Sequence, residues 1–171
     1  MDQIAETVLP PPAPDHADSA ARFDIASRLF LRLYQDSNLL HKTGTRALGR
    51  YGATTQQWAV LGALSRPAVR AHGMAVKDLI GFLMVSRQNL TAVLDRLEAA
   101  HLIERARDTR DGRLRHVRLT AQGERTWADM QVSIRAYYAD ALSDFSSAEC
   151  LQLFRLLDRL RDGLTRLSGP E

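Results

Sequence analysis

Along most of the chain, apolar side chains recur every three or four residues, which is the period of an amphipathic helix. The first such stretch runs from Arg22 to near Gly49 or Gly52 and predicts one long helix. Residues 1–20 lack this period and contain four prolines. We therefore expect a flexible N-terminal arm, followed by a helical segment over residues 21–53.

Three shorter helices are predicted in the next fifty residues. Thr54 and the glutamine three positions later have the spacing of a capping box, which opens a helix that we expect Pro67 to close. A brief helix follows at residues 76–83. After a break of two or three residues, Ser86 can cap a further helix that runs to about Ala100.

The period then changes to that of short strands. Residues 102–107 and 114–119 are predicted to be two strands, and the polar, glycine-containing loop 108–113 joins them into a hairpin. Thr120 starts another long helix. A second capping box at Ser146 opens the last helix.

The predicted order is thus four helices, a hairpin and two helices. Two short helices separated by a tight turn and followed by a hairpin are the components of a winged helix-turn-helix. We expect a mainly α fold with a small β-hairpin wing, in which residues 54–123 form the winged helix-turn-helix lobe. The flanking helices of residues 21–53 and 124–168 carry apolar stripes that this small lobe does not need, so we expect them to form a dimerisation region.

The composition shows an uneven distribution of charge and argues against a membrane-spanning or secreted protein. The net charge is +3, but residues 1–20 carry four acidic and no basic side chains, so residues 21–171 carry +7. Such a surplus of positive charge suits a polyanionic partner, but by itself it is weak evidence for one. The chain shows no apolar run of membrane-spanning length and no secretory signal pattern, and its lone Cys150 fits a reducing compartment. We expect a cytoplasmic protein.

The predicted helix from Ser86 onward has the properties of a DNA-reading helix. Its leucines and valine face one side, which leaves polar side chains near its N-terminal end: Ser86, Arg87, Gln88, Asn89 and Thr91. Arginine offers a two-point match to guanine, and glutamine or asparagine to adenine, while the helix N-terminus favours phosphate. The alternative is an ordinary solvated helix face. Lys77, at the start of the preceding helix, is a further candidate contact.

The hairpin favours the DNA-reading interpretation, because it concentrates positive charge directly after that helix. Fourteen residues hold Arg105, Arg107, Arg110, Arg113, Arg115 and Arg118. Arginine enters the narrow, electronegative minor groove well, and a neighbouring aspartate can orient its guanidinium group. A solvated charged hairpin is the alternative.

Several segments resemble the MarR family of regulators. They are Val85 to Glu98, His101 to Arg105, Asp111-Gly112-Arg113 and Leu119 to Gly123. The resemblance implies a homodimer, built from the first and the last two helices, that binds a near-palindromic operator in double-stranded DNA. It also implies that Arg113 enters the minor groove at the wing tip and that Asp111 orients it. Many relatives have a basic residue where this chain has Ala92, so base reading is expected to depend more on Arg87 and Gln88.

The resemblance further implies a small-molecule effector bound between the dimer helices and the lobe. A cation beside an aromatic surface suits an aromatic carboxylate or its coenzyme A thioester. The candidate lining residues are Arg28, Arg32, His41, Arg46 and Trp58. Each could equally be a surface charge or, for Trp58, a core residue. We expect a repressor that the effector releases, because occupying promoter DNA is enough to block transcription.

Catalysis finds no support in the sequence. The five histidines are scattered without metal-ligand spacing, and no nucleophile motif, phosphate loop or dinucleotide fingerprint occurs. We expect no enzyme activity, no metal and no cofactor. The remaining alternative is a helical protein-interaction module without specific DNA binding, which would leave the arginine-rich hairpin unexplained.

Overall fold

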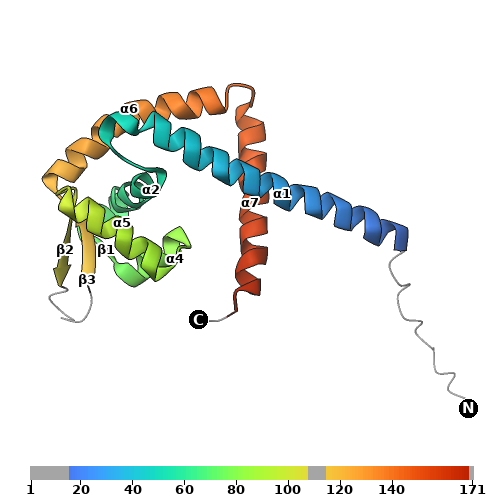
Figure 1. Cartoon of the computed structure of the whole chain (residues 1–171), viewed down its shortest axis with the longest axis horizontal. Coiled ribbons are helices and arrows are strands. Elements are labelled where there is room, and N and C mark those ends of the chain that lie inside the picture. Colours follow the sequence, from blue (N-terminus) through green and yellow to red (C-terminus); the bar gives the residue numbers. More distant parts are fainter. Residues whose placement is uncertain (1–15, 108–114, 170–171) are drawn as a thin grey trace, which may run out of the picture. The chain divides into compact units, whose positions relative to one another are not determined.

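The computed structural model describes residues 16–107 and 115–169, which fall into two compact units, Met1–Lys42 and Thr43–Glu171. The first unit holds most of the long helix α1 (His16–Ala47) (Figure 1). This helix begins inside the range that we predicted to be an arm, so that boundary is wrong for residues 16–20. Ala20 and Ala21 favour a helix without any apolar period, which explains why the periodicity missed these residues.

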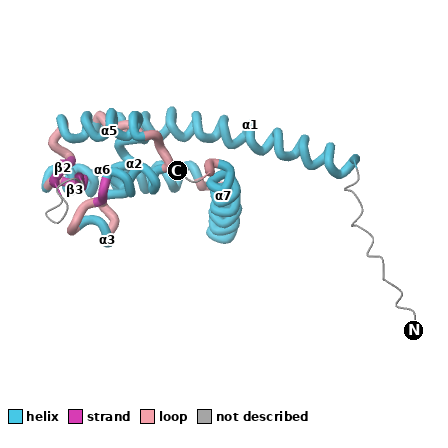
Figure 2. The backbone as a smooth tube through the Cα atoms, turned by 90° about the horizontal axis from the view of Figure 1, so that it is seen from below, coloured by secondary structure: helices cyan, strands magenta, loops and turns pink. Residues whose placement is uncertain are grey.

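The second unit contains the end of α1 and the remaining elements. In chain order these are η1 (Gly49–Tyr51), α2 (Thr55–Leu64), α3 (Pro67–Arg70), β1 (Met74–Ala75), α4 (Val76–Leu83), α5 (Arg87–Ala99), β2 (Ile103–Arg107), β3 (Arg115–Leu119), α6 (Ala121–Ala141) and α7 (Ser147–Leu167). Helices therefore make up most of this unit, and the small sheet is confined to its winged lobe (Figure 2).

The predicted helix starts are confirmed by their caps. Thr54 accepts a hydrogen bond from the Gln57 backbone N–H at 3.3 Å, and the Gln57 side chain accepts one from the Thr54 N–H at 2.8 Å. Ser86 caps α5 by accepting from the Asn89 N–H at 3.2 Å. Ser146 opens α7 with a second complete capping box. These local bonds satisfy backbone donors that a helix start would otherwise leave without partners.

Two predictions are wrong in detail. Pro67 does not close α2, which ends at Leu64. Instead it lies in the first turn of α3, where the missing N–H of proline costs no hydrogen bond. The wing is also more than a hairpin, because β1 pairs antiparallel with β3 and gives a three-stranded sheet in the order β1-β3-β2. A strand of two residues is too short to show a period in the sequence.

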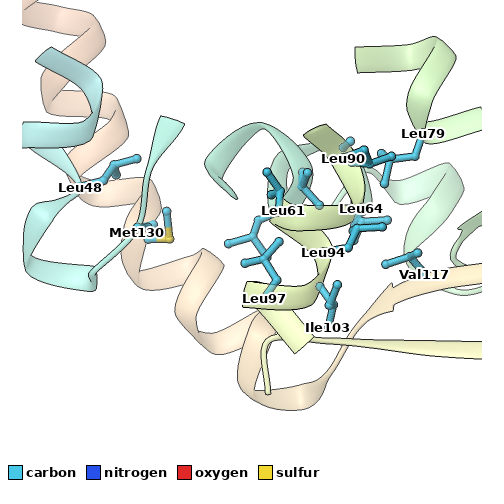
Figure 3. Packing of buried hydrophobic residues seen from close by; sticks show 14 of the residues in the cluster. Leu48, Leu61, Leu64, Leu79, Leu90, Leu94, Leu97, Ile103, Val117 and Met130 are labelled. Atoms are coloured by element: carbon cyan, nitrogen blue, oxygen red, sulfur yellow. The ribbon is translucent and has the colours of Figure 1, made fainter. Parts of the chain in front are cut away.

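The core of the lobe lies between α2, α5 and the sheet. The inward row of α5 has the predicted spacing and is buried at Leu90, Val93, Leu94 and Leu97. It packs with leucines of α2 and with Ile103 and Val117 of the sheet (Figure 3). Burial of this row decides which side of α5 faces outward.

The start of α6 is held against the end of α5 by unusually close backbone contact. The Thr120 N–H donates to the Leu102 carbonyl at 3.1 Å, and the Thr120 hydroxyl donates to the His101 carbonyl at 2.6 Å. At Gly123, an added Cβ would lie 1.9 Å from the Leu102 oxygen. Only glycine fits there, which gives a physical reason for the Leu-Thr-x-x-Gly sequence.

The helices outside the lobe expose much apolar surface within the single chain. α7 has no buried residue, and Phe154 and Leu167 are 60% and 84% exposed. In the first unit, Phe23 is 74% exposed. Within residues 16–107 and 115–169, no helix has the length and apolar character needed to cross a membrane.

We predict that Gly123→Ala destabilises the chain by about 2–3 kcal/mol, because the new methyl group would push a backbone carbonyl out of place. Gly81→Ala is the matched control. Gly81 lies on the exposed side of α4 with no atom near its Cβ position, so alanine should gain up to about 1 kcal/mol from helix propensity. Urea unfolding measures both, and equal stability of the two variants would contradict the close contact.

Candidate nucleic-acid interface

The outer face of α5 presents the predicted reading residues to solvent. Ser86, Arg87, Gln88, Asn89 and Thr91 are all exposed, and they lie opposite the buried leucine row. Ala92 is exposed on the same helix. Lys77 is exposed in the first turn of α4, the helix that precedes α5 across a tight turn. The structure therefore places every one of these predicted contacts on the surface.

These residues differ in how much hydrogen-bonding capacity they keep for a ligand. The Ser86 hydroxyl is engaged as the helix cap, and the Thr91 hydroxyl donates to the Arg87 carbonyl at 2.8 Å. Among the described residues, none forms a hydrogen bond or ion pair with the side chains of Arg87 or Gln88. The first turn of α5 thus offers the Arg87 guanidinium group and the Gln88 amide group toward solvent, beside the positive end of the helix dipole.

The tight turn before α5 depends on a left-handed residue. Met84, which ends α4, has φ 53° and is followed two residues later by the Ser86 cap. Such a conformation is uncommon for a residue other than glycine. It brings α4 and α5 together as the two helices of a helix-turn-helix.

Among the described residues of the hairpin, Arg105 and Arg118 form ion pairs inside the lobe. Arg105 forms an ion pair with Asp95, and its Nε lies 3.3 Å from the Glu98 carboxylate. Its side chain is only 18% exposed. Arg118 pairs with Glu104 directly across β2 and β3. Arg105 and Arg118, which are not among the predicted DNA contacts, therefore form ion pairs within the lobe.

Sequence reasoning missed the role of Asp95 and Glu98. They are three positions apart on α5, so they lie on one face of the helix and can both reach Arg105 of β2. This ion pair links the reading helix to the wing. Two acidic residues one turn apart, followed by an arginine in the next strand, were the available signal.

The remaining predicted contacts of the wing are described only in part. Arg107 and Arg115 are paired opposite each other as the last residues of β2 and the first of β3. Arg110, Asp111 and Arg113 lie outside the described residues. The predicted entry of Arg113 into the minor groove thus stays a prediction.

The predicted effector residues are divided between the two units. In the first unit, Arg28 forms an ion pair with Asp24 one helical turn away, and Arg32 and His41 are exposed on α1. In the second unit, Arg46 is exposed and Trp58 is half-buried. The five residues therefore stay a predicted effector site, of which the second unit holds Arg46 and Trp58.

Trp58 lies in an aromatic cluster that the sequence did not predict. Its ring centroid is 5.8 Å from that of Tyr138, which in turn is 6.2 Å from Tyr137. Burial, and secondarily Tyr137, raises the pKa of the Tyr138 hydroxyl. Trp58 also lines a hollow with Gly44, Ala47, Leu48, Ile134 and Tyr137, and the space between these side chains is too narrow for a water molecule.

Comparison with known proteins places this geometry among regulators. The sequence profile of the MarR family matches residues 51–114. The transcriptional activatory protein BadR of Rhodopseudomonas palustris is 50% identical, over 86% of this chain and 84% of its own length. The homoprotocatechuate degradative operon repressor of Escherichia coli is 28% identical, over 64% of this chain and 71% of its own length.

A solved structure shows a similar fold. The PcaV transcriptional regulator from Streptomyces coelicolor, crystallised in complex with its natural ligand, aligns with a TM-score of 0.63 at 26% identity. The alignment covers 74% of this chain and 89% of PcaV. The mainly helical fold with a three-stranded antiparallel sheet is therefore that of winged-helix regulators.

We predict that Arg105→Met costs about 1 kcal/mol of stability, because it removes a partly buried guanidinium group from two carboxylates. Arg118→Met is the matched control on the neighbouring strand. Both members of its ion pair are about half-exposed, so its loss should cost about 0.5 kcal/mol or less. Chemical denaturation compares the two, and a larger loss for Arg118→Met would refute the assigned link between α5 and the wing.

Proposed function

Because the chain belongs to the MarR family of transcriptional regulators, we propose that it binds duplex DNA as a homodimer at a near-palindromic operator. The observation that carries this proposal is the first turn of α5. There the side chains of Arg87 and Gln88 are exposed and form no hydrogen bond or ion pair with the described residues, on a helix whose other face is buried. A rigid helix with uncommitted donors and acceptors at its N-terminal end is what major-groove reading needs.

In this proposal the exposed residues divide the work of DNA binding. Arg87 would bond guanine and Gln88 adenine, each through two atoms, with Asn89 beside them. Lys77, Ser86 and Thr91 would contact phosphate or sugar, which fixes the register without reading sequence. Exposed Ala92 offers a methyl group suited to a thymine methyl and no charge.

The wing would supply the second point of contact. We propose that Arg107, Arg110, Arg113 and Arg115 lie along the minor groove, with Arg113 deepest and Asp111 orienting its guanidinium group. Arg105 and Arg118 are left out of this proposed set because they form ion pairs within the lobe.

Homodimerisation is supported by the apolar surfaces outside the lobe. Along α7, apolar side chains alternate at spacings of three and four over Cys150, Leu153, Leu157, Leu160, Leu164 and Leu167. This heptad pattern belongs to a helix seam that packs against another helix. A second copy would cover it and place two α5 helices about one DNA turn, roughly 34 Å, apart.

We also propose that a small aromatic carboxylate, or its coenzyme A thioester, releases the DNA. The name of the Escherichia coli relative refers to homoprotocatechuate, an aromatic acid, and the PcaV structure holds a natural ligand. In this chain, Trp58 provides aromatic surface and Arg46 provides an exposed cation. Arg28, Arg32 and His41 of α1 are the further proposed contacts.

For the direction of regulation, we propose repression. The two relatives have opposite names, activatory and repressor, so the direction has to be measured on this chain. A reporter fused to the bound promoter distinguishes them: deletion of the regulator raises transcription under repression and lowers it under activation.

Selection of bound duplexes from a random pool tests the proposal as a whole. We expect a near-palindromic consensus, with an affinity that falls steeply as salt rises, because phosphate contacts release counterions. Retention of no duplex, or an affinity that salt leaves unchanged, would favour the protein-interaction alternative.

We predict that Arg87→Ala changes which sequences are selected more than it lowers affinity for unrelated DNA. Arg113→Ala should lower operator affinity at least about tenfold without changing the melting temperature, since one groove contact is worth about 1–3 kcal/mol. Fluorescence anisotropy with operator and scrambled duplexes measures both. An equal loss of specific and non-specific binding in Arg87→Ala would make Arg87 a phosphate contact.

We predict that a phenolic acid or its thioester raises the melting temperature of the chain, since a ligand that binds the folded state stabilises it. Arg46→Gln should weaken this shift, and Arg125→Gln, on the exposed side of α6, should leave it unchanged. A thermal-shift screen measures the effect, and no shift with any aromatic acid would refute the effector proposal.

A further inference from the structure

A row of polar groups on α6 faces the stretch from Thr43, near the end of α1, to Tyr51, in the connection to α2. The Asp129 carbonyl, Ser133 and Tyr137 follow one another at intervals of four residues, so they lie on one side of the helix. The Tyr51 hydroxyl donates to the Asp129 carbonyl at 2.7 Å and lies 3.4 Å from the Ser133 hydroxyl. One turn further along, the Tyr137 and Thr43 hydroxyls are hydrogen-bonded at 2.8 Å.

The Tyr51 hydroxyl is held in a defined orientation. The Arg50 guanidinium donates to its oxygen at 2.6 Å and lies 4.8 Å from the centre of its ring. Because an arginine can only donate, the single hydroxyl hydrogen of Tyr51 is left for the Asp129 carbonyl. This chain of bonds fixes the 3-10 turn of Tyr51 against the middle of α6.

An apolar row runs beside the polar row and holds the same elements together. Met130 and Ile134 are buried and pack in the core that contains Leu48, at the end of α1. Apolar burial is non-directional, so it favours contact without selecting one rotation or one axial position of α6. Hydrogen bonds weaken steeply when their angle changes, so the bonds of Tyr51 and Tyr137 do select one rotation of α6.

We propose that Tyr51 and Tyr137 are positioning residues for DNA recognition, which hold α6 at one rotation against the connection between α1 and α2. This inference rests on the proposed function. α6 starts in the lobe at Ala121, its Gly123 contacts Leu102 in the turn after α5, and the exposed residues Leu142 and Phe145 follow its last turn. Its rotation therefore sets how each lobe is presented to DNA relative to the apolar helices that we propose for the dimer.

Three single substitutions test this, each of which removes one oxygen atom. Tyr51→Phe and Tyr137→Phe remove the positioning bonds. Tyr138→Phe is the matched control, because Tyr138 is next to Tyr137 and contacts Trp58, while its hydroxyl has no hydrogen bond within the described part of the chain. The readout is affinity for the selected operator and for the same half-sites with one base pair added to or removed from the spacer.

We expect Tyr51→Phe and Tyr137→Phe each to reduce the preference for the natural spacer about fivefold, the worth of one neutral hydrogen bond. Tyr138→Phe should leave it unchanged, and all three variants should keep the salt dependence of binding. Thr43→Val should reduce the preference at least as much as Tyr137→Phe, and Thr43→Ser, which keeps the hydroxyl group, should retain the preference of the unaltered chain.

The outcomes separate the two proposals. An unaltered spacer preference in Tyr51→Phe and Tyr137→Phe, with the unaltered chain binding its operator, would overturn the positioning role and leave the proposed function standing. An equal loss of spacer preference in Tyr138→Phe would also overturn the positioning role, because the effect would then follow the polarity of any tyrosine ring. Failure of the unaltered chain to bind any duplex would overturn both.

Discussion

Burial of the inner row of α5 is the constraint on which the rest of the lobe depends. Leu90, Val93, Leu94 and Leu97 are enclosed between α2 and the sheet, and this burial leaves the helix no other rotation. The outward position of Arg87 is thus a consequence of apolar packing. A substitution in the buried row would therefore change what the helix presents, although no buried residue can touch a ligand.

Directional contacts then refine what apolar packing leaves undecided. The ion pair of Arg105 with Asp95 links α5 to the wing, and the contact of Gly123 with Leu102 fixes the start of α6 against the end of α5. The ion pair joins neighbouring elements, whereas the glycine contact joins α6 to the turn that precedes the two hairpin strands. Together they connect the reading helix to β2 and to the first turn of α6.

Local signals predicted much of the fold. Thr54, Ser86 and Ser146 each mark a helix start through bonds within four residues, which sequence spacing reveals directly. Partners distant in sequence did not emerge. The pairing of β1 with β3, and the bond of Tyr51 to α6, depend on tertiary packing that no local period encodes. The predicted effector residues have no such local signal either, since charge and aromatic character say nothing of spatial proximity.

The lack of burial along α7 has a thermodynamic consequence. Most helical stability in proteins comes from packing of an amphipathic face, and α7 has no buried residue within its own chain. If a second copy supplies that burial, the order of α7 becomes linked to association, and mass action governs it. Dilution would then loosen α7 while the leucine core of the lobe stays folded, so the chain would have two stabilities, of which only one depends on concentration.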